Sequence, residues 1–456
     1  MTIHASRRAF LQRASALSIA GSAAPWALSL AAIGEAAAAT ATDYKALVCV
    51  FLYGGNDYGN TLIPYDNARY TAYQGMRPTL AYAQSALAAT LLTPRVALPG
   101  GIQYAIAPEL SPLLPIFNAG HMGVLLNVGT LVQPTTKAQY TANSVPLPPK
   151  LFSHNDQQSV WQASSPEGAT SGWGGRMGDL FEAGNGNASF TCVNVSSNAV
   201  FLSGKQAVQY QVSASGPVAL TAAKTLFGSN ACAAELQRLI TAPRSHLLEN
   251  EHAKVVARAL SAGGQLTTAL AGGKTLSTPF PSGNSLADQL KLVARLISTS
   301  NEVGAKRQVF FVSLGGFDNH DGLDTVHPAL LTTVAEALSA FYAATTELGV
   351  ANQVTTFTAS DFGRTLTGND GSDHGWGSMH FMLGGAVAGG RFYGSEPMVA
   401  NNGDDDVGQG RLLPSTSVDQ YAATLGKWFG ISDTDLLSVL PNLVNWNASQ
   451  RNLGFV

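Results

Sequence analysis

Four apolar runs of strand length recur along the chain, and each one ends abruptly in a glycine-rich or polar segment. They span residues 46–53, 121–128, 308–314 and 354–358. A continuous apolar run fits a strand that helices cover on both faces, as in a parallel sheet. Segments with helical periodicity lie between the runs, over 235–240, 246–260 and 285–300. The alternation predicts an α/β fold, a three-layer α/β/α sandwich with a mostly parallel central sheet.

The chain shows no internal repeat and no linker long enough to separate independent domains. Its 456 residues are 45% hydrophobic, which is enough to bury a large core. A stretch rich in Ala, Ser and Gly, beginning near residue 194, carries few candidate ligands. We therefore expect one domain over residues 45–456 with a helical insertion around 194–300.

The N-terminal segment has the features of an export signal. Arg7 and Arg8 precede Phe10 and Leu11, as in the twin-arginine motif, and a moderately apolar stretch follows over 16–33. Four alanines at 36–39 suit signal peptidase. Gly and Pro interrupt the apolar stretch, which disfavours a stable membrane anchor. The sequence predicts a signal peptide over 1–39 that engages the twin-arginine translocase and leads to a periplasmic or secreted protein.

Charge and cysteine content exclude several classes of protein. The formal net charge is −3, and the predicted signal holds three arginines and one glutamate, so the rest of the chain is more acidic still. No basic run of the kind that binds nucleic acid is present. Three cysteines permit one disulfide, between Cys192 and Cys232 for example, but no disulfide framework. Cys49 lies within the first apolar run and is expected to be buried.

Carboxylates and imidazoles gather directly after the predicted strands. In an open α/β sheet, ligands bind at the carboxyl ends of the strands, where such side chains can converge on a divalent ion. Imidazole with carboxylate suits Zn or Mn, whereas oxygen ligands alone suit Ca. A single Asp after a strand often serves only as a helix cap or turn former, but the set as a whole favours a metal site. The candidate ligands are Asp57, Asp318, His320, Asp361, Asp373, His374 and His380.

Two further places offer catalytic groups. Ser153 and His154 precede a helix-like run over 157–163, where a serine either caps the helix or acts as a nucleophile at its positive end. Arg364 follows Asp361 closely and can grip an anionic group with its fork or pair with a structural carboxylate. Ser153, His154 and Arg364 are therefore the candidate catalytic residues.

The order of these blocks resembles a large bacterial family of exported proteins of unknown function. The blocks are Gly-Gly-Asn-Asp57, Phe-Ser-His154, Gly-Gly-Phe-Asp318-Asn-His320, Ser-Asp361-Phe-Gly-Arg364-Thr and Asp373-His374, and the resemblance covers roughly residues 45–430. That family is grouped with the alkaline phosphatase and sulfatase superfamily. The resemblance implies a central sheet between helices and a metal site that hydrolyses phosphate or sulfate esters.

The resemblance also implies roles for single residues. Asp57 and Asp361 would be metal ligands, Asp318 with His320 and His374 would complete the site, and Ser153 would stand near the nucleophile position. Phe362 occupies a place where the superfamily has a histidine, which puts a second metal in doubt. The chain lacks Cys-x-Pro-x-Arg, so formylglycine chemistry is not expected.

Three functions remain open at this point. The first is a hydrolase of phosphate or sulfate esters that uses a divalent Zn, Mn or Ca ion and takes an anionic ester as substrate. The second is an inactive periplasmic binding or assembly protein on the same fold, which Phe362 favours. The third, a serine esterase of the α/β-hydrolase type, is disfavoured because the chain contains no Gly-x-Ser-x-Gly.

Overall fold

The four apolar runs form strands of a ten-stranded sheet in a computed structural model, which describes residues 41–456 apart from 369 and 399. The predicted signal peptide, residues 1–39, lies outside the described residues. The strand order is β11 (Arg391–Tyr393), β4 (Met122–Gly129), β10 (Ser378–Leu383), β9 (Val354–Ser360), β1 (Lys45–Leu52), β8 (Arg307–Leu314), β5 (Cys192–Asn194), β6 (Tyr210–Ser213) and β7 (Gly216–Pro217). The short strand β12 (Thr416–Ser417) pairs with β4, and β2 (Leu62–Pro64) with β3 (Tyr104–Ile106) forms a separate ribbon.

The sheet is mostly parallel, as predicted. β1 pairs in parallel with both β8 and β9, and β5 continues the parallel series from β8 to β6. The main exception is β10, which runs antiparallel to both β9 and β4 and so separates β4 from the other central strands.

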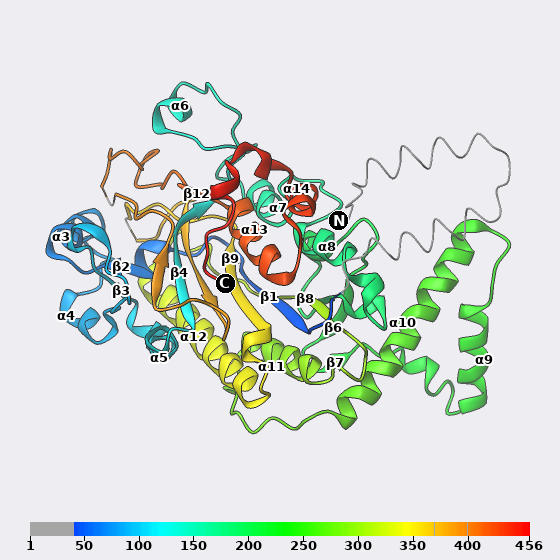
Figure 1. Cartoon of the computed structure of the whole chain (residues 1–456). Helices are drawn as coiled ribbons and strands as arrows, with labels where there is room; N and C mark the ends of the chain where they lie inside the picture. The colour runs from blue at the N-terminus through cyan, green and yellow to red at the C-terminus, as the bar shows by residue number, and fades with distance from the viewer. Residues whose placement is uncertain (1–40, 369, 399) are drawn as a thin grey trace, which may run out of the picture. The chain divides into compact units, whose positions relative to one another are not determined.

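Helices cover both faces of the sheet and complete the three layers (Figure 1). Helix α11 (Ser285–Ser298) packs on β8 and on α12 (Leu323–Glu347) at one face. Helix α13 (Val418–Phe429) packs on β1 and β4 at the other, where α7 (His154–Ala163), α8 (Trp173–Asp179) and α14 (Asp433–Val439) also lie. The remaining short helices are α3 (Asn67–Met76), α4 (Gln84–Leu87), α5 (Leu114–Ala119) and α6 (Lys137–Thr141).

Alternate residues of β1 face the two helical layers, which explains why the strand is apolar over residues 46–52. Ala46, Val48 and Val50 belong to one core cluster with residues of α11 and α12. On the opposite face of the sheet, Phe357 of β9 packs against Trp173 of α8 and Tyr421 of α13. A strand buried from both sides is therefore largely apolar along its length. Cys49 is buried, as expected.

The region around 194–300 contains β6 and β7 at the edge of the sheet, and then α9 (Asn230–Thr241) and α10 (Leu247–Gly272). These two helices contact each other and stand out beyond the β6–β7 edge in Figure 1. Few of their residues are buried, namely Ala233 of α9 and four residues of α10. All three cysteines are free, and Cys232 is exposed on α9. Within the described part of the chain, no helix combines the length and apolar character needed to cross a membrane.

Two histidines in the core make stability depend on pH. Burial lowers the pKa of His327 to about 4 and that of His380 to about 3. The native state then binds fewer protons than the unfolded state below about pH 6.5, so stability falls as the pH falls through this window. At pH 5 each histidine should cost about 2 kcal/mol. Urea unfolding at pH 7.5 and 5.0 should show a smaller acid loss in a His380→Gln variant, and an equal loss would contradict the assignment.

Candidate metal centre

The carboxyl ends of β1, β8 and β9 meet at one edge of the sheet. Leu52 at the end of β1 is in register with Leu314 of β8 and Ser360 of β9, so the segments that follow them lie side by side. Gly54 is needed at this edge, because its φ is +114° and a Cβ there would lie 2.4 Å from the backbone nitrogen of Asp318. This crowding brings the predicted ligands of separate segments into contact.

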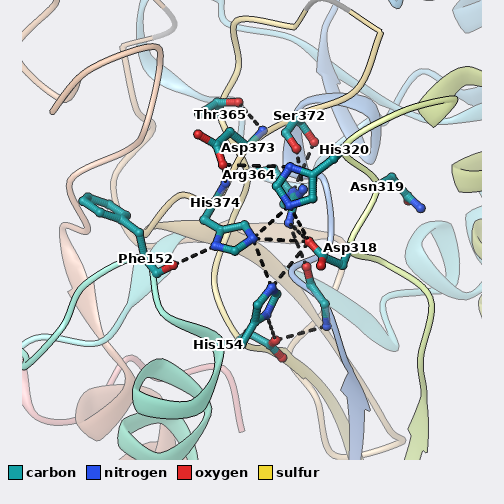
Figure 2. Close-up of polar contacts among 12 residues, drawn as sticks. Phe152, His154, Asp318, Asn319, His320, Arg364, Thr365, Ser372, Asp373 and His374 are labelled. Carbon is teal, nitrogen blue, oxygen red and sulfur yellow. Dashed lines mark hydrogen bonds and ion pairs between the residues drawn. The ribbon is translucent and has the colours of Figure 1, made fainter.

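Three imidazoles and one carboxylate converge at this edge (Figure 2). Nε2 of His374 lies 3.1 Å from Nε2 of His154 and 3.0 Å from Nε2 of His320. Oδ1 of Asp318 lies 3.4, 3.3 and 3.0 Å from Nε2 of His154, His374 and His320, respectively. They come from three segments: His154 from the start of α7, Asp318 and His320 from the loop after β8, and His374 from the loop after β9. We call these four residues the His154 cluster.

The Nδ1 nitrogens of His154 and His374 already take part in hydrogen bonds. His154 donates Nδ1–H to Oδ2 of Asp361 at 2.6 Å, and Gln158 and the Gly54 backbone donate to the same oxygen. His374 donates Nδ1–H to the carbonyl oxygen of Phe152 at 2.7 Å, since a carbonyl can only accept. In their neutral forms both rings therefore turn an unprotonated Nε2 toward the other ligand atoms.

The pKa values of residues in the His154 cluster are shifted in different directions. The hydrogen bond to Asp361 raises the pKa of His154 against the effect of burial, whereas burial lowers the pKa of His374. Although burial opposes it, Arg364 lowers the pKa of Asp318 by donating to Oδ1 at 2.7 Å. Asp318 therefore stays ionised at neutral pH and presents a negative charge to the three rings.

A second row of residues holds the loop that carries His374. Arg411 donates Nε–H to the His374 carbonyl oxygen at 2.6 Å and Nη2–H to Oδ2 of Asp373 at 2.9 Å. Oδ1 of Asp373 accepts from the His374 backbone and lies 4.0 Å from Nδ1 of His320. His320, Asp373 and His374 form a second group whose ligand atoms lie within 4.8 Å of one another. Asp318, His320 and Asp373 are about half exposed, so the site opens to solvent on this side.

The sequence profile of a family described as "Protein of unknown function (DUF1501)" matches residues 44–439. The chain belongs to this family. The predicted resemblance to a family of unknown function is thereby confirmed. No curated protein matches this DUF1501 chain.

Several solved structures are similar to the DUF1501 chain in fold. The PsFucS1 sulfatase from Pseudoalteromonas sp. matches at 11% identity with a TM-score of 0.33, over 86% of this chain and 68% of that one. The alkaline phosphatase from the Antarctic bacterium TAB5 matches at 10% identity with a TM-score of 0.30, over 88% and 99% of the two chains. Ps i-CgsB in complex with k-i-k-neocarrahexaose matches at 9% with a TM-score of 0.35, over 89% and 77%. At these sequence identities and TM-scores, the similarity assigns no role to any residue of the DUF1501 chain.

Four predicted ligands lie outside the His154 cluster: Asp373 belongs to the second group, and the other three are Asp57, His380 and Asp361. Asp57 is fully buried, and both of its carboxylate oxygens accept from Arg77, at 2.5 and 2.7 Å. His380 lies in β10 within the core, 3.1 Å from Oγ1 of Thr358 and edge-on to the ring of Trp161. Asp361 contacts the cluster only through His154. The sequence shows which carboxylates and imidazoles follow the strands, but it does not show which of them already have hydrogen-bond or ion-pair partners. For this reason it predicts more ligands than the cluster contains.

The predicted catalytic residues also take other places. Ser153 donates its hydroxyl to Oδ2 of Asp156 in the first turn of α7, at 3.1 Å. Arg364 is fully buried, and its guanidinium donates hydrogen bonds to the Gly54 carbonyl, to Ser372 and to Asp318. His154, also a candidate catalytic residue, turns its Nε2 toward ligand atoms of His374 and Asp318. The Phe362 ring packs beside the rings of His154 and His374, and its centroid lies 4.8 and 4.9 Å from theirs.

Proposed function

We propose that the His154 cluster binds one divalent metal ion and that the protein hydrolyses phosphate or sulfate esters after export to the periplasm. The observation that carries the metal is the convergence of Nε2 of His154, Nε2 of His374 and Oδ1 of Asp318. Two neutral imidazoles whose Nδ1–H groups are both engaged repel each other at 3.1 Å. A cation bound between these three atoms removes the repulsion and satisfies all three, with His320 beside them.

The spacing of three ligand atoms fits a small tetrahedral ion. With metal–ligand bonds of about 2.0–2.1 Å, tetrahedral ligands stand about 3.3 Å apart. The separations among Nε2 of His154, Nε2 of His374 and Oδ1 of Asp318 are 3.1, 3.3 and 3.4 Å. Two imidazoles with one carboxylate favour Zn²⁺ over Ca²⁺, which prefers oxygen ligands. His154 and His374 also carry the outer hydrogen bonds that are typical of metal-bound histidine.

The charges around the site favour an anionic substrate. Asp318, Asp361 and Asp373 contribute three negative charges, and Arg364 and Arg411 offset two of them. A divalent ion makes the sum positive. When bound, such an ion polarises an ester oxygen and lowers the pKa of a water molecule. Arg364 and Asp361 would hold Asp318 and His154 in place, and the exposed side near His320 would admit the ester.

One observation favours the second candidate, an inactive binding or assembly protein: the serine at the start of α7 is already engaged. The ligand set itself does not favour it, since three protein ligands would leave a fourth position open, as in catalytic zinc sites. Ser153, bonded to Asp156, does not supply a nucleophile in this arrangement, so water would have to attack.

Metal content and ester turnover distinguish these proposals. We expect protein exported by its own signal to contain zinc near one ion per chain by elemental mass spectrometry. We then expect it to cleave members of a panel of aryl phosphate and aryl sulfate esters, assayed with added Zn²⁺, Mn²⁺ or Ca²⁺. Bound metal without cleavage of any ester would favour the binding protein. A folded chain that takes up none of the three ions would refute the metal site itself.

A further inference from the structure

Phe152 has a backbone conformation that is rare for a bulky residue. Its φ is +72°, in the left-handed region, and it directly precedes Ser153 and helix α7. Large side chains avoid this region because the Cβ approaches the backbone too closely. Such conformations persist where the surrounding structure imposes them, and they cluster at functional sites.

The conformation turns the Phe152 carbonyl toward the His154 cluster. In Figure 2 this oxygen points at the ring of His374, and Nδ1–H of His374 donates to it at 2.7 Å. The bond places the ring proton on Nδ1 and leaves Nε2 free to bind a cation. A residue with an ordinary φ at this position would direct its carbonyl elsewhere, and the His374 proton could then move to Nε2.

Side-chain contacts hold Phe152 and His374 together. The Arg411 guanidinium lies over the Phe152 ring, 5.1 Å from its centroid, and also donates to the His374 carbonyl oxygen. The Phe152 ring packs beside a small apolar cluster that includes Trp376 and Leu413. In the wild-type chain these contacts offset the cost of the unfavourable backbone conformation, a cost that glycine at this position would not have.

We propose that Phe152 is a positioning residue of the metal centre, which fixes the tautomer of His374 through its left-handed backbone and not through its ring. This inference rests on the proposed function in so far as His374 is taken as a metal ligand. Phe152 touches none of the cluster's Nε2 atoms, so it acts only through His374.

Three variants separate the backbone of Phe152 from its ring. Phe152→Gly removes the ring but adopts a positive φ freely. Phe152→Ile keeps apolar volume but resists a positive φ because its Cβ is branched, and Phe152→Leu is the milder version in case the Ile chain does not fold. The readouts are the ¹⁵N shifts of the His374 ring in the metal-free protein, assigned by their loss in His374→Gln, and the Kd for Zn²⁺.

We expect Phe152→Gly to keep the Nδ1–H tautomer and a near wild-type Kd even though lost packing lowers its Tm. Phe152→Ile, or Leu in its place, should mix the tautomers and raise the Kd about 10- to 100-fold. An unchanged tautomer in the Ile or Leu variant, or its loss in the Gly variant, would overturn the proposal. If the wild type binds no zinc, the proposed function fails, yet the tautomers of the metal-free chains still test the role of Phe152.

Discussion

Replacing His374 with alanine should weaken divalent metal binding by more than about 100-fold, since even the loss of an outer hydrogen bond to a metal ligand typically costs 10- to 100-fold. Nε2 of His374 lies within 3.3 Å of ligand atoms of His154, His320 and Asp318, so its removal opens the centre of the cluster. Ester cleavage, if present in the wild type, should fall to the background rate. Titration calorimetry with Zn²⁺ gives the affinity directly.

Thermal unfolding offers a second measure of the same prediction. Zinc at 100 times its Kd should stabilise the wild-type chain by about 2.7 kcal/mol, and this gain should fall to about 0.4 kcal/mol or less in His374→Ala. His252, exposed on α10, supplies the matched control, and His252→Ala should keep the full zinc-dependent gain. If His374→Ala retained that gain, the ion would have to bind elsewhere on the chain.

Replacing Arg77 with methionine should destabilise the fold by about 3–5 kcal/mol, the usual cost of leaving one member of a buried ion pair alone. Arg77 and Asp57 are both essentially inaccessible to solvent. Beyond its two bonds to Asp57, Arg77 donates to Asn60 and to the carbonyl oxygens of Thr365 and Leu366. Arg77 therefore ties helix α3 to the loop after β9, and Met leaves the Asp57 charge without a partner.

Urea unfolding at pH 7.5 should show this loss, with Arg69→Met as the control. Arg69 lies on the same helix but is partly exposed and 3.8 Å from Asp66, so its removal should cost less than about 1 kcal/mol. Zinc affinity of the folded Arg77→Met chain should match the wild type. A large drop in that affinity would show that the bonds from Arg77 to the Thr365 and Leu366 carbonyls also hold the metal centre in place.

The sequence predicts the central strands of the sheet well because a strand that is buried on both faces appears as a largely apolar run. The run at 46–53 is apolar and that at 308–314 is broken only by Gln308 and Ser313, and they become the neighbouring strands β1 and β8. The same logic predicts that residues after these strands converge, and Asp318, His320 and His374 do so.

The remaining features of the candidate site depend on partners that no local pattern reveals. Asp57 follows a strand just as Asp318 does, but a distant Arg77 engages it. In the sequence, His154 is typical of a residue beside a helix cap. In the structure, the hydrogen bond from its Nδ1 to Asp361 orients its ring. The Phe152 carbonyl is a backbone group, so residue types alone give no sign of its role.

The exposed α9–α10 hairpin makes the chain well suited to site-selective fluorescent labelling. Burial raises the pKa of the Cys49 and Cys192 thiols well above the usual value, and both are shielded from reagents. Cys232 is exposed on α9, on a hairpin that extends beyond the sheet edge opposite β11. A maleimide dye should therefore react at this one thiol without mutagenesis, which provides an optical reporter for ligand titrations on the native sequence.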